Sequence, residues 1–201
     1  MGRPKKISDS DILLMAFNVI SREGFESFTF EQVAKATGLS PAALVKRFKT
    51  KKRMAYLARN QKWDKNLSIM NVRKIAQLHG LDGIFEFLLI TAKNVDSKRL
   101  GEHLRWLGAE AGDPKAKKKV GAYFAETRKI FLGLIQEAST NHELKIIGTP
   151  EDLAMTLEAL LQGSIFQFAF LDEKNIGRHL EDRFRSVLRP MIQVESRNAV
   201  Q

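Results

Sequence analysis

Six cationic side chains gather in residues 37–54, which read TGLSPAALVKRFKTKKRM. They are Lys46, Arg47, Lys49, Lys51, Lys52 and Arg53. Small residues come just before them, so a backbone there could approach another surface closely. Lysine and arginine bind phosphate oxygens, while serine hydroxyls and alanine methyl groups can contact the edges of bases. The stretch therefore predicts either a helix that reads DNA or a solvated cationic surface.

The charge of the whole chain favours a polyanionic partner for this end. The net charge is +10, and residues 1–65 contain 14 Lys+Arg against 6 Asp+Glu, whereas residues 66–201 contain 19 against 17. A basic block joined to a nearly neutral body is typical of nucleic-acid binding. On charge alone, a merely basic surface remains the alternative.

Capping signals predict the first two helices that position the stretch. Ser8, with an acid three residues later, opens an amphipathic run that ends at Gly24. Thr29 and Gln32 form a capping box for a short helix to about residue 37.

The third predicted helix carries the small residues and the first cations. Ser40 can cap it and Pro41 suits its first position, so the helix runs to about Phe48, with Leu44 and Phe48 facing the core. Gly38 gives the freedom of a tight turn before it. Two short helices joined in this way match a helix-turn-helix, although a three-helix packing unit without nucleic acid has the same topology.

The segment GRPKKISDSDILLMAFNVISREGFESFTFEQVAKATGLSPAALVKRFKTKKRMAYLA resembles the DNA-binding domain of the TetR (tetracycline repressor) family. The matching marks are the Gly-Arg-Pro start, the A-F-x-x-I-x-x-x-G-F pattern over residues 16–25, the threonine-capped helix, the Gly-Leu-Ser turn and the closing Phe48 with Thr50-Lys51. The likeness covers about residues 2–60. The chain departs from the family pattern at Val45, where an aromatic is usual, at Lys46 and Arg47, near which histidine is common, and at Lys52, which replaces an acid.

The resemblance implies a set of DNA contacts. Thr29 and Lys51 would contact phosphates, and the third helix would read the major groove. The basic N-terminal residues would form an arm that reaches the minor groove or the backbone, with disordered positive charge that makes no specific contact as the alternative. Lys46 could reach a guanine edge or a phosphate. The expected DNA-binding residues are Arg3, Lys5, Lys6, Thr29, Ser40, Pro41, Ala42, Ala43, Val45, Lys46, Arg47 and Lys51.

The rest of the chain also reads as helical, so we predict an all-α fold. It would comprise a three-helix helix-turn-helix domain (residues 1–50) and a helical effector-binding and dimerisation domain (residues 51–201). Helical patterns fall near residues 82–95, 98–111, 115–139, 150–172 and 176–194.

The helix near residues 150–172 carries two apolar stripes, which indicates packing against two bodies. The resemblance implies that the last two helices pair with their copies in a second subunit, although a helix central in a monomer would also be apolar on two sides. The expected dimerisation residues are Leu157, Leu160, Leu161, Ser164, Phe168, Leu180, Phe184, Val187 and Leu188.

The resemblance further implies a small-molecule effector of unknown identity among the middle helices. The candidate lining residues are Phe85, Leu88, Leu89, His103, Leu104, Leu107, Phe124, Thr127, Phe131 and Phe166. An apolar stripe more often forms core than a pocket, so core packing is the alternative for each of them.

Other classes of protein find little support. The chain has no cysteine, its four histidines lack metal-ligand spacing, and there is no P-loop, dinucleotide or nucleophile-elbow motif, so we expect no enzyme, metal or cofactor. The basic run at residues 115–119 could contact a membrane surface but lacks an adjoining bulky apolar face. An architectural or RNA-binding role would not explain the large neutral body. We expect a dimeric, prokaryotic, cytoplasmic and nucleoid-associated regulator, a repressor rather than an activator, which binds a pseudo-palindromic operator and no membrane.

Overall fold

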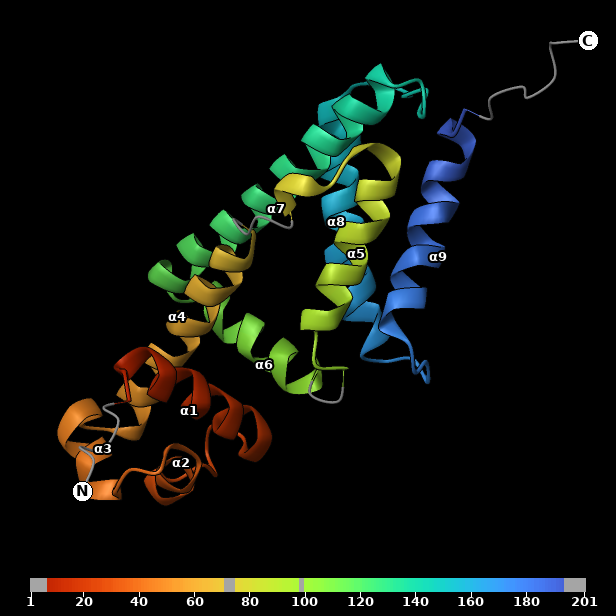
Figure 1. Ribbon diagram of the computed structural model, residues 1–201. Helices are drawn as coiled ribbons and strands as arrows, with labels where there is room; N and C mark the ends of the chain where they lie inside the picture. Colours follow the sequence, from red (N-terminus) through yellow and green to blue (C-terminus); the bar gives the residue numbers. More distant parts are fainter. Residues whose placement is uncertain (1–6, 71–74, 98–99, 194–201) are drawn as a thin grey trace, which may run out of the picture. The chain divides into compact units, whose positions relative to one another are not determined.

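The computed structural model describes residues 7–70, 75–97 and 100–193 and is helical throughout these ranges apart from turns and one short bridge. Contacts divide the chain into two compact units (Figure 1). The first unit contains residues 1–69 and 101–121, and the second contains residues 70–100 and 122–201. The predicted all-α fold is therefore confirmed. Among the described helices, none combines the length and apolar character needed to cross a bilayer.

Three helices open the first unit: α1 (Asp9–Glu23), α2 (Phe30–Thr37) and α3 (Pro41–Phe48). The predicted caps are present, because the Thr29 and Ser40 side chains accept hydrogen bonds from the third backbone N–H of their helices. Gln32 completes the capping box by accepting from the Thr29 N–H. Gly38 adopts a left-handed conformation (φ 72°), which glycine supplies without a steric cost. Local chemistry thus determines where these helices begin and turn.

A compact apolar core holds α1, α2 and α3 together and extends into α4 (Lys51–Met70). Thr50 caps α4 by accepting a hydrogen bond from the Arg53 N–H at 3.1 Å. The first turns of α4 then place Met54 and Ala58 in this core, so α4 is built into the group of helices α1 to α4, which we call the head, rather than attached to its surface. The buried side chains of the core are Ile12, Leu13, Ala16, Val19, Ile20, Phe28, Val33, Ala34, Leu44, Phe48, Met54, Ala55 and Ala58.

The first unit also includes most of α6 (Leu100–Ala111) and the start of α7 (Pro114–Thr140). Two ion pairs fasten this segment to α4. Arg59 Nη2 donates to Asp113 Oδ2 at 2.7 Å, with both side chains largely buried, and Lys119 Nζ donates to Asp64 Oδ1 at 2.6 Å. The unit is therefore made of two stretches of chain that are far apart in the sequence.

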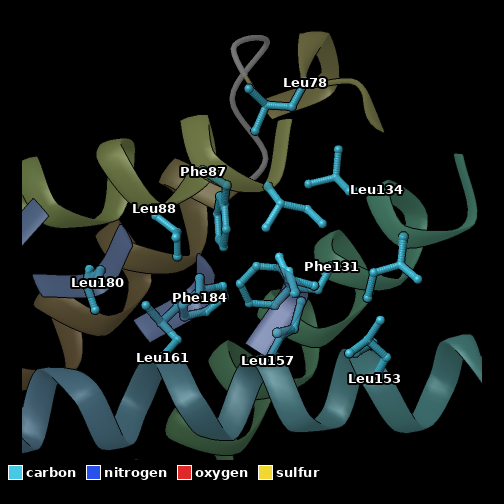
Figure 2. Packing of buried hydrophobic residues seen from close by; sticks show 14 of the residues in the cluster. Leu78, Phe87, Leu88, Phe131, Leu134, Leu153, Leu157, Leu161, Leu180 and Phe184 are labelled. Carbon is cyan, nitrogen blue, oxygen red and sulfur yellow. The ribbon is translucent and has the colours of Figure 1, made fainter. Parts of the chain in front are cut away.

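The second unit contains α5 (Gly80–Asn94), the remainder of α7, α8 (Pro150–Phe168) and α9 (Ile176–Leu188), with short 3-10 helices η1 (Ile75–Gln77) and η3 (Arg189–Met191). Figure 2 shows its core, in which Phe131 of α7 lies between rings from two other helices. The ring centroids of Phe131 and Phe87 are 5.3 Å apart, edge to face, and those of Phe131 and Phe184 are 5.6 Å apart. Phe131 therefore joins α5, α7 and α9 in one core.

Several helix boundaries differ from the sequence prediction, and two of the larger differences have a structural reason. The α5 helix starts at Gly80 because the Glu137 and Glu143 carboxylates accept the backbone N–H groups of Gly80 and Leu81. The α8 helix ends at Phe168 in a turn, four residues early. The α9 helix ends at Leu188 and not near residue 194, since Pro190 has no N–H to continue the helical hydrogen bonds.

Candidate DNA interface

The α3 helix presents a free face that is suited to reading DNA. Leu44 and Phe48 are buried in the core of the head, whereas Ala42, Val45 and Lys46 are exposed on the other side. Their spacing of three and four residues places the exposed side chains on one face of the helix. Val45 is 44% exposed, so it adds an apolar side chain to this face.

The N-terminus of α3 combines a small surface with available polar groups. The Ser40 hydroxyl oxygen accepts the Ala43 N–H at 3.2 Å, which leaves its own O–H free to donate. Ser40 and Ala42 are exposed, and Pro41 and Ala43 are half-buried. A base edge could approach this end closely, because no long side chain blocks it.

The predicted cations differ in how they are held. Lys46 is exposed and makes no ion pair with any residue that the structure describes. Arg47 Nη1 lies 3.2 Å from Asp9 Oδ1 of α1. Lys51 donates to the Glu26 carbonyl at 3.1 Å and lies 4.9 Å from the Phe28 ring centroid. Lys46 is thus available to DNA, while the other two have partners within the head.

The remaining predicted DNA contacts are Thr29 and the N-terminal arm. Thr29 is half-buried, and its hydroxyl oxygen accepts the Gln32 N–H at 3.2 Å, so its first role is to cap α2. Arg3, Lys5 and Lys6 lie outside the described residues.

The predicted effector residues are divided between core and surface. Leu88, Thr127 and Phe131 are buried in the second unit, and Thr127 donates its hydroxyl to the Tyr123 carbonyl. Leu104 and Leu107 are half-buried in the first unit, Phe124 is half-buried in the second, and Phe166 is exposed. The side chain of His103 lies outside the described residues.

Three of these residues do come together, at a hollow of about 290 Å³ on the surface of the second unit. Phe85, Leu88 and Leu89 line it beside Gly177, and acidic side chains with Arg185 form the rest. The Arg185 guanidinium lies 4.4 Å from the Phe85 ring centroid and pairs with Glu181 at 2.7 Å. Arg185 therefore already occupies the face of the Phe85 ring, and the hollow combines apolar, acidic and cationic side chains.

Most of the predicted dimerisation residues lie inside the second unit. Leu157, Leu161, Ser164, Phe168, Leu180, Phe184 and Leu188 are buried in that unit, and Leu160 and Val187 are half-buried. The second stripe of α8 is exposed instead. Met155 and Phe166 project from it, and Phe170 follows just beyond the end of the helix with 72% of its surface exposed.

Several polar residues that organise the structure were missed at the sequence level. Asp9, Asp64 and Asp113 hold basic side chains, but their partners lie 38 to 55 residues away, so no local pattern announces them. Glu158 is buried in α8 beside Arg128 at 3.1 Å. The feature of the sequence that could have indicated this burial is that Glu158 is a single acid within an apolar run. Burial raises the pKa of the nearby Tyr123 phenol to about 12, and the Glu158 carboxylate acts in the same direction.

The comparisons with known proteins agree with this geometry. A family model described as "Bacterial regulatory proteins, tetR family" matches residues 12–55, from α1 to the start of α4. No curated protein sequence matches the chain significantly. Solved structures share the fold over nearly the whole length, at identities low enough that they bear on the fold alone.

A protein from Saccharomonospora viridis in complex with choline aligns with a TM-score of 0.73 and 14% identity, covering 91% of this chain and 96% of the other. A TetR transcription regulator from Haloarcula marismortui aligns with a TM-score of 0.68 and 14% identity, covering 92% and 98%. A TetR-family regulator from Cytophaga hutchinsonii gives a TM-score of 0.63 and 17% identity, covering 95% and 100%. The matched helix-turn-helix, the exposed α3 face and the shared helical fold lead to one conclusion: residues 12–55 form the DNA-binding domain of the TetR family of bacterial regulatory proteins.

Proposed function

We propose that this regulator is a homodimeric repressor that binds a pseudo-palindromic operator and is released by a small molecule. The observation that carries the proposal is the α3 helix, whose Leu44 and Phe48 are anchored in the core while Ala42, Val45 and Lys46 stay exposed. Such a helix can enter the major groove without disturbing the core of the head. The site of action would be the cytoplasmic nucleoid.

In this proposal the α3 face supplies sequence readout and its surroundings supply phosphate contacts. Ala42 and Val45 offer methyl groups to thymine, and Lys46 reaches a guanine edge or a phosphate. Thr29 and Lys51 stand at the starts of α2 and α4, where free N–H groups and the helix dipole favour an anion. Arg47 keeps unused guanidinium donors beyond the one that binds Asp9.

We propose that the exposed row on α8 forms the dimer surface. Met155, Phe166 and Phe170 would be its apolar centre. A second copy of the chain is the occupant that the family resemblance implies, and burying such a row would stabilise the association by roughly 25 cal/mol for each Å² of apolar surface. A twofold axis would present two α3 helices to successive half-sites.

The effector part of the proposal rests on the polar and aromatic groups of the second unit. The hollow beside Phe85 and the pair of buried Glu158 with exposed Arg128 are two places where charged side chains could contact a ligand. The choline complex of the Saccharomonospora viridis protein makes an organic cation the first class to test. A regulator without an effector, or an activator, is the alternative that the same experiment distinguishes.

The test is selection of bound genomic fragments by the purified protein, with and without a metabolite pool that includes choline. We expect an enriched twofold site near the genes it controls and an affinity that falls steeply with salt. We also expect that the site is no longer enriched when the metabolite pool is present. Binding that is indifferent to salt, or no enriched site, would overturn the proposal. If a site is enriched but the metabolite pool does not release the protein from it, the effector part of the proposal fails and a DNA-binding regulator without an effector remains.

A further inference from the structure

The start of α7 carries four lysines within five residues, and three of them have no evident structural task. Ala116 is fully buried and anchors this turn, which leaves Lys115, Lys117 and Lys118 exposed. None of these three forms an ion pair with a residue that the structure describes, whereas Lys119 is held by Asp64 at 2.6 Å. We call Lys115, Lys117 and Lys118 the α7 lysine face.

The placement of this face is unfavourable for the helix itself. The N-terminus of a helix carries a partial positive charge, so each nearby cation costs about 0.3–1 kcal/mol, and adjacent lysines also repel one another. The first turn of α7 contains no acid to offset this cost. The Asp113 carboxylate before it caps the helix by accepting the Lys115 and Ala116 N–H groups, and its other oxygen pairs with Arg59. One carboxylate therefore offsets only part of the cost of four lysines, and a residual conflict of this kind is typical of a functional surface.

The α7 lysine face is also fixed relative to α4. The pairs Arg59–Asp113 and Lys119–Asp64 attach the start of α7 to α4. Arg59 and Asp64 lie eight and thirteen residues beyond Lys51, the first residue of α4. At a rise of about 1.5 Å per residue, these positions lie about 12 and 20 Å along α4 from its first residue. The face therefore stands at a defined distance from the end of α4 that the proposed function places against phosphate.

The α7 lysine face belongs to the more basic of the two units, which also contains α3. Residues 1–69 and 101–121 contain 19 Lys+Arg against 9 Asp+Glu, whereas the rest of the chain contains 14 against 14. The first unit thus carries the whole net charge of +10, and the α7 lysines supply part of that excess. The second unit is neutral.

We propose that Lys115, Lys117 and Lys118 form a second phosphate-binding surface, which contacts the DNA backbone flanking the operator rather than the operator itself. This inference rests on the proposed DNA-binding function. The contacts carry no sequence information, so they strengthen binding to operators within longer DNA and leave the preferred sequence unchanged.

The test compares two duplexes that carry one operator selected by the wild-type protein. The first ends at the operator, and the second extends it by about 10 bp, one helical turn, on each side. The variant is Lys115→Gln, Lys117→Gln, Lys118→Gln. On the extended duplex its slope of log Kobs against log[salt] should become less negative by about 0.9 for each lost phosphate contact, or about 2.7 for one subunit. On the short duplex the slope should stay as in the wild type.

The matched control is Lys93→Gln, Lys129→Gln, Lys145→Gln, which removes the same charge from exposed positions of the neutral unit and should leave both slopes unchanged. Unfolding curves of both triple variants verify that the fold is intact. If the wild type binds neither duplex, the proposed function fails. If the wild type binds but the α7 variant has the same salt slopes as the control on both duplexes, the inference is overturned. The α7 lysine face would then bind an acidic protein or only solvent.

Discussion

Asp9 in the first turn of α1 holds Arg47 at the end of α3, with 3.2 Å between Oδ1 and Nη1. The pair joins the start of α1 to the end of the helix that would read DNA. Both side chains are partly exposed, so the pair itself contributes at most about 1 kcal/mol to stability. Its larger effect is on Arg47, whose guanidinium is occupied before DNA arrives.

Asp9→Asn should raise affinity for unrelated DNA several-fold and lower the preference for the operator. The change removes a negative charge and frees Arg47 to bind any nearby phosphate. The measurement is Kd for operator and scrambled duplexes at fixed salt. Asp11→Asn is the control, since it removes the same charge from the same turn without touching Arg47. Equal effects of Asp9→Asn and Asp11→Asn would refute the prediction. An effect of Asp9→Asn that is also seen in a protein carrying Arg47→Ala would refute it too.

Lys46→Ala and Lys51→Ala should act differently on DNA binding. Lys46 is free on the reading face, so its loss should change which site is preferred, by about 1–3 kcal/mol at a guanine contact. Lys51→Ala should weaken all sites about equally. It should also lower the free energy of unfolding by about 1 kcal/mol, because its bond to the Glu26 carbonyl is lost. Repeating the site selection with each variant measures both effects, and a uniform loss for Lys46→Ala would reassign it to the backbone.

Phe166→Asp should convert the proposed homodimer into monomers without unfolding the chain. Phe166 is 52% exposed on α8, so a charge there is tolerated in the monomer but not in an apolar interface. Sedimentation equilibrium should show a monomer, and affinity for the twofold operator should fall. Phe131→Ala is the contrasting variant, because removing this central ring should cost about 3–5 kcal/mol of stability. A Phe166→Asp protein that stays dimeric would rule out this face.

The α5 N-terminus should give the second unit a measurable sensitivity to acid. The backbone N–H of Gly80 and the His79 side chain hold the pKa of Glu137 below its ordinary value of 4.5. The stabilisation is therefore complete above about pH 4.5 and is lost as pH falls through the lower, folded-state pKa. Urea unfolding between pH 3 and 7 measures this effect. The free energy of unfolding should be higher for the wild type than for Glu137→Gln at neutral pH, and this difference should become smaller in acid. A difference of constant size would contradict this assignment.

The sequence was most informative where structure is decided locally. Ser8, Thr29 and Ser40 cap their helices as predicted, because a cap needs only its own first turn. The two stripes of α8 were also apparent. Which stripe lies inside was not, since Leu157 and Phe166 are both apolar and only the neighbouring helices distinguish them. The Arg59–Asp113 pair joins residues 54 positions apart, a distance over which periodicity carries no information.

The same pair has a practical consequence for exchanging domains between regulators. A fragment cut after α4 would lack Asp113, the carboxylate that pairs with Arg59, and Lys119, which makes the second ion pair to α4. A chimaera that grafts this reading head onto a different sensor would therefore need residues 101–121 as well. The portable module is two pieces of polypeptide, and a single crossover point cannot transfer it.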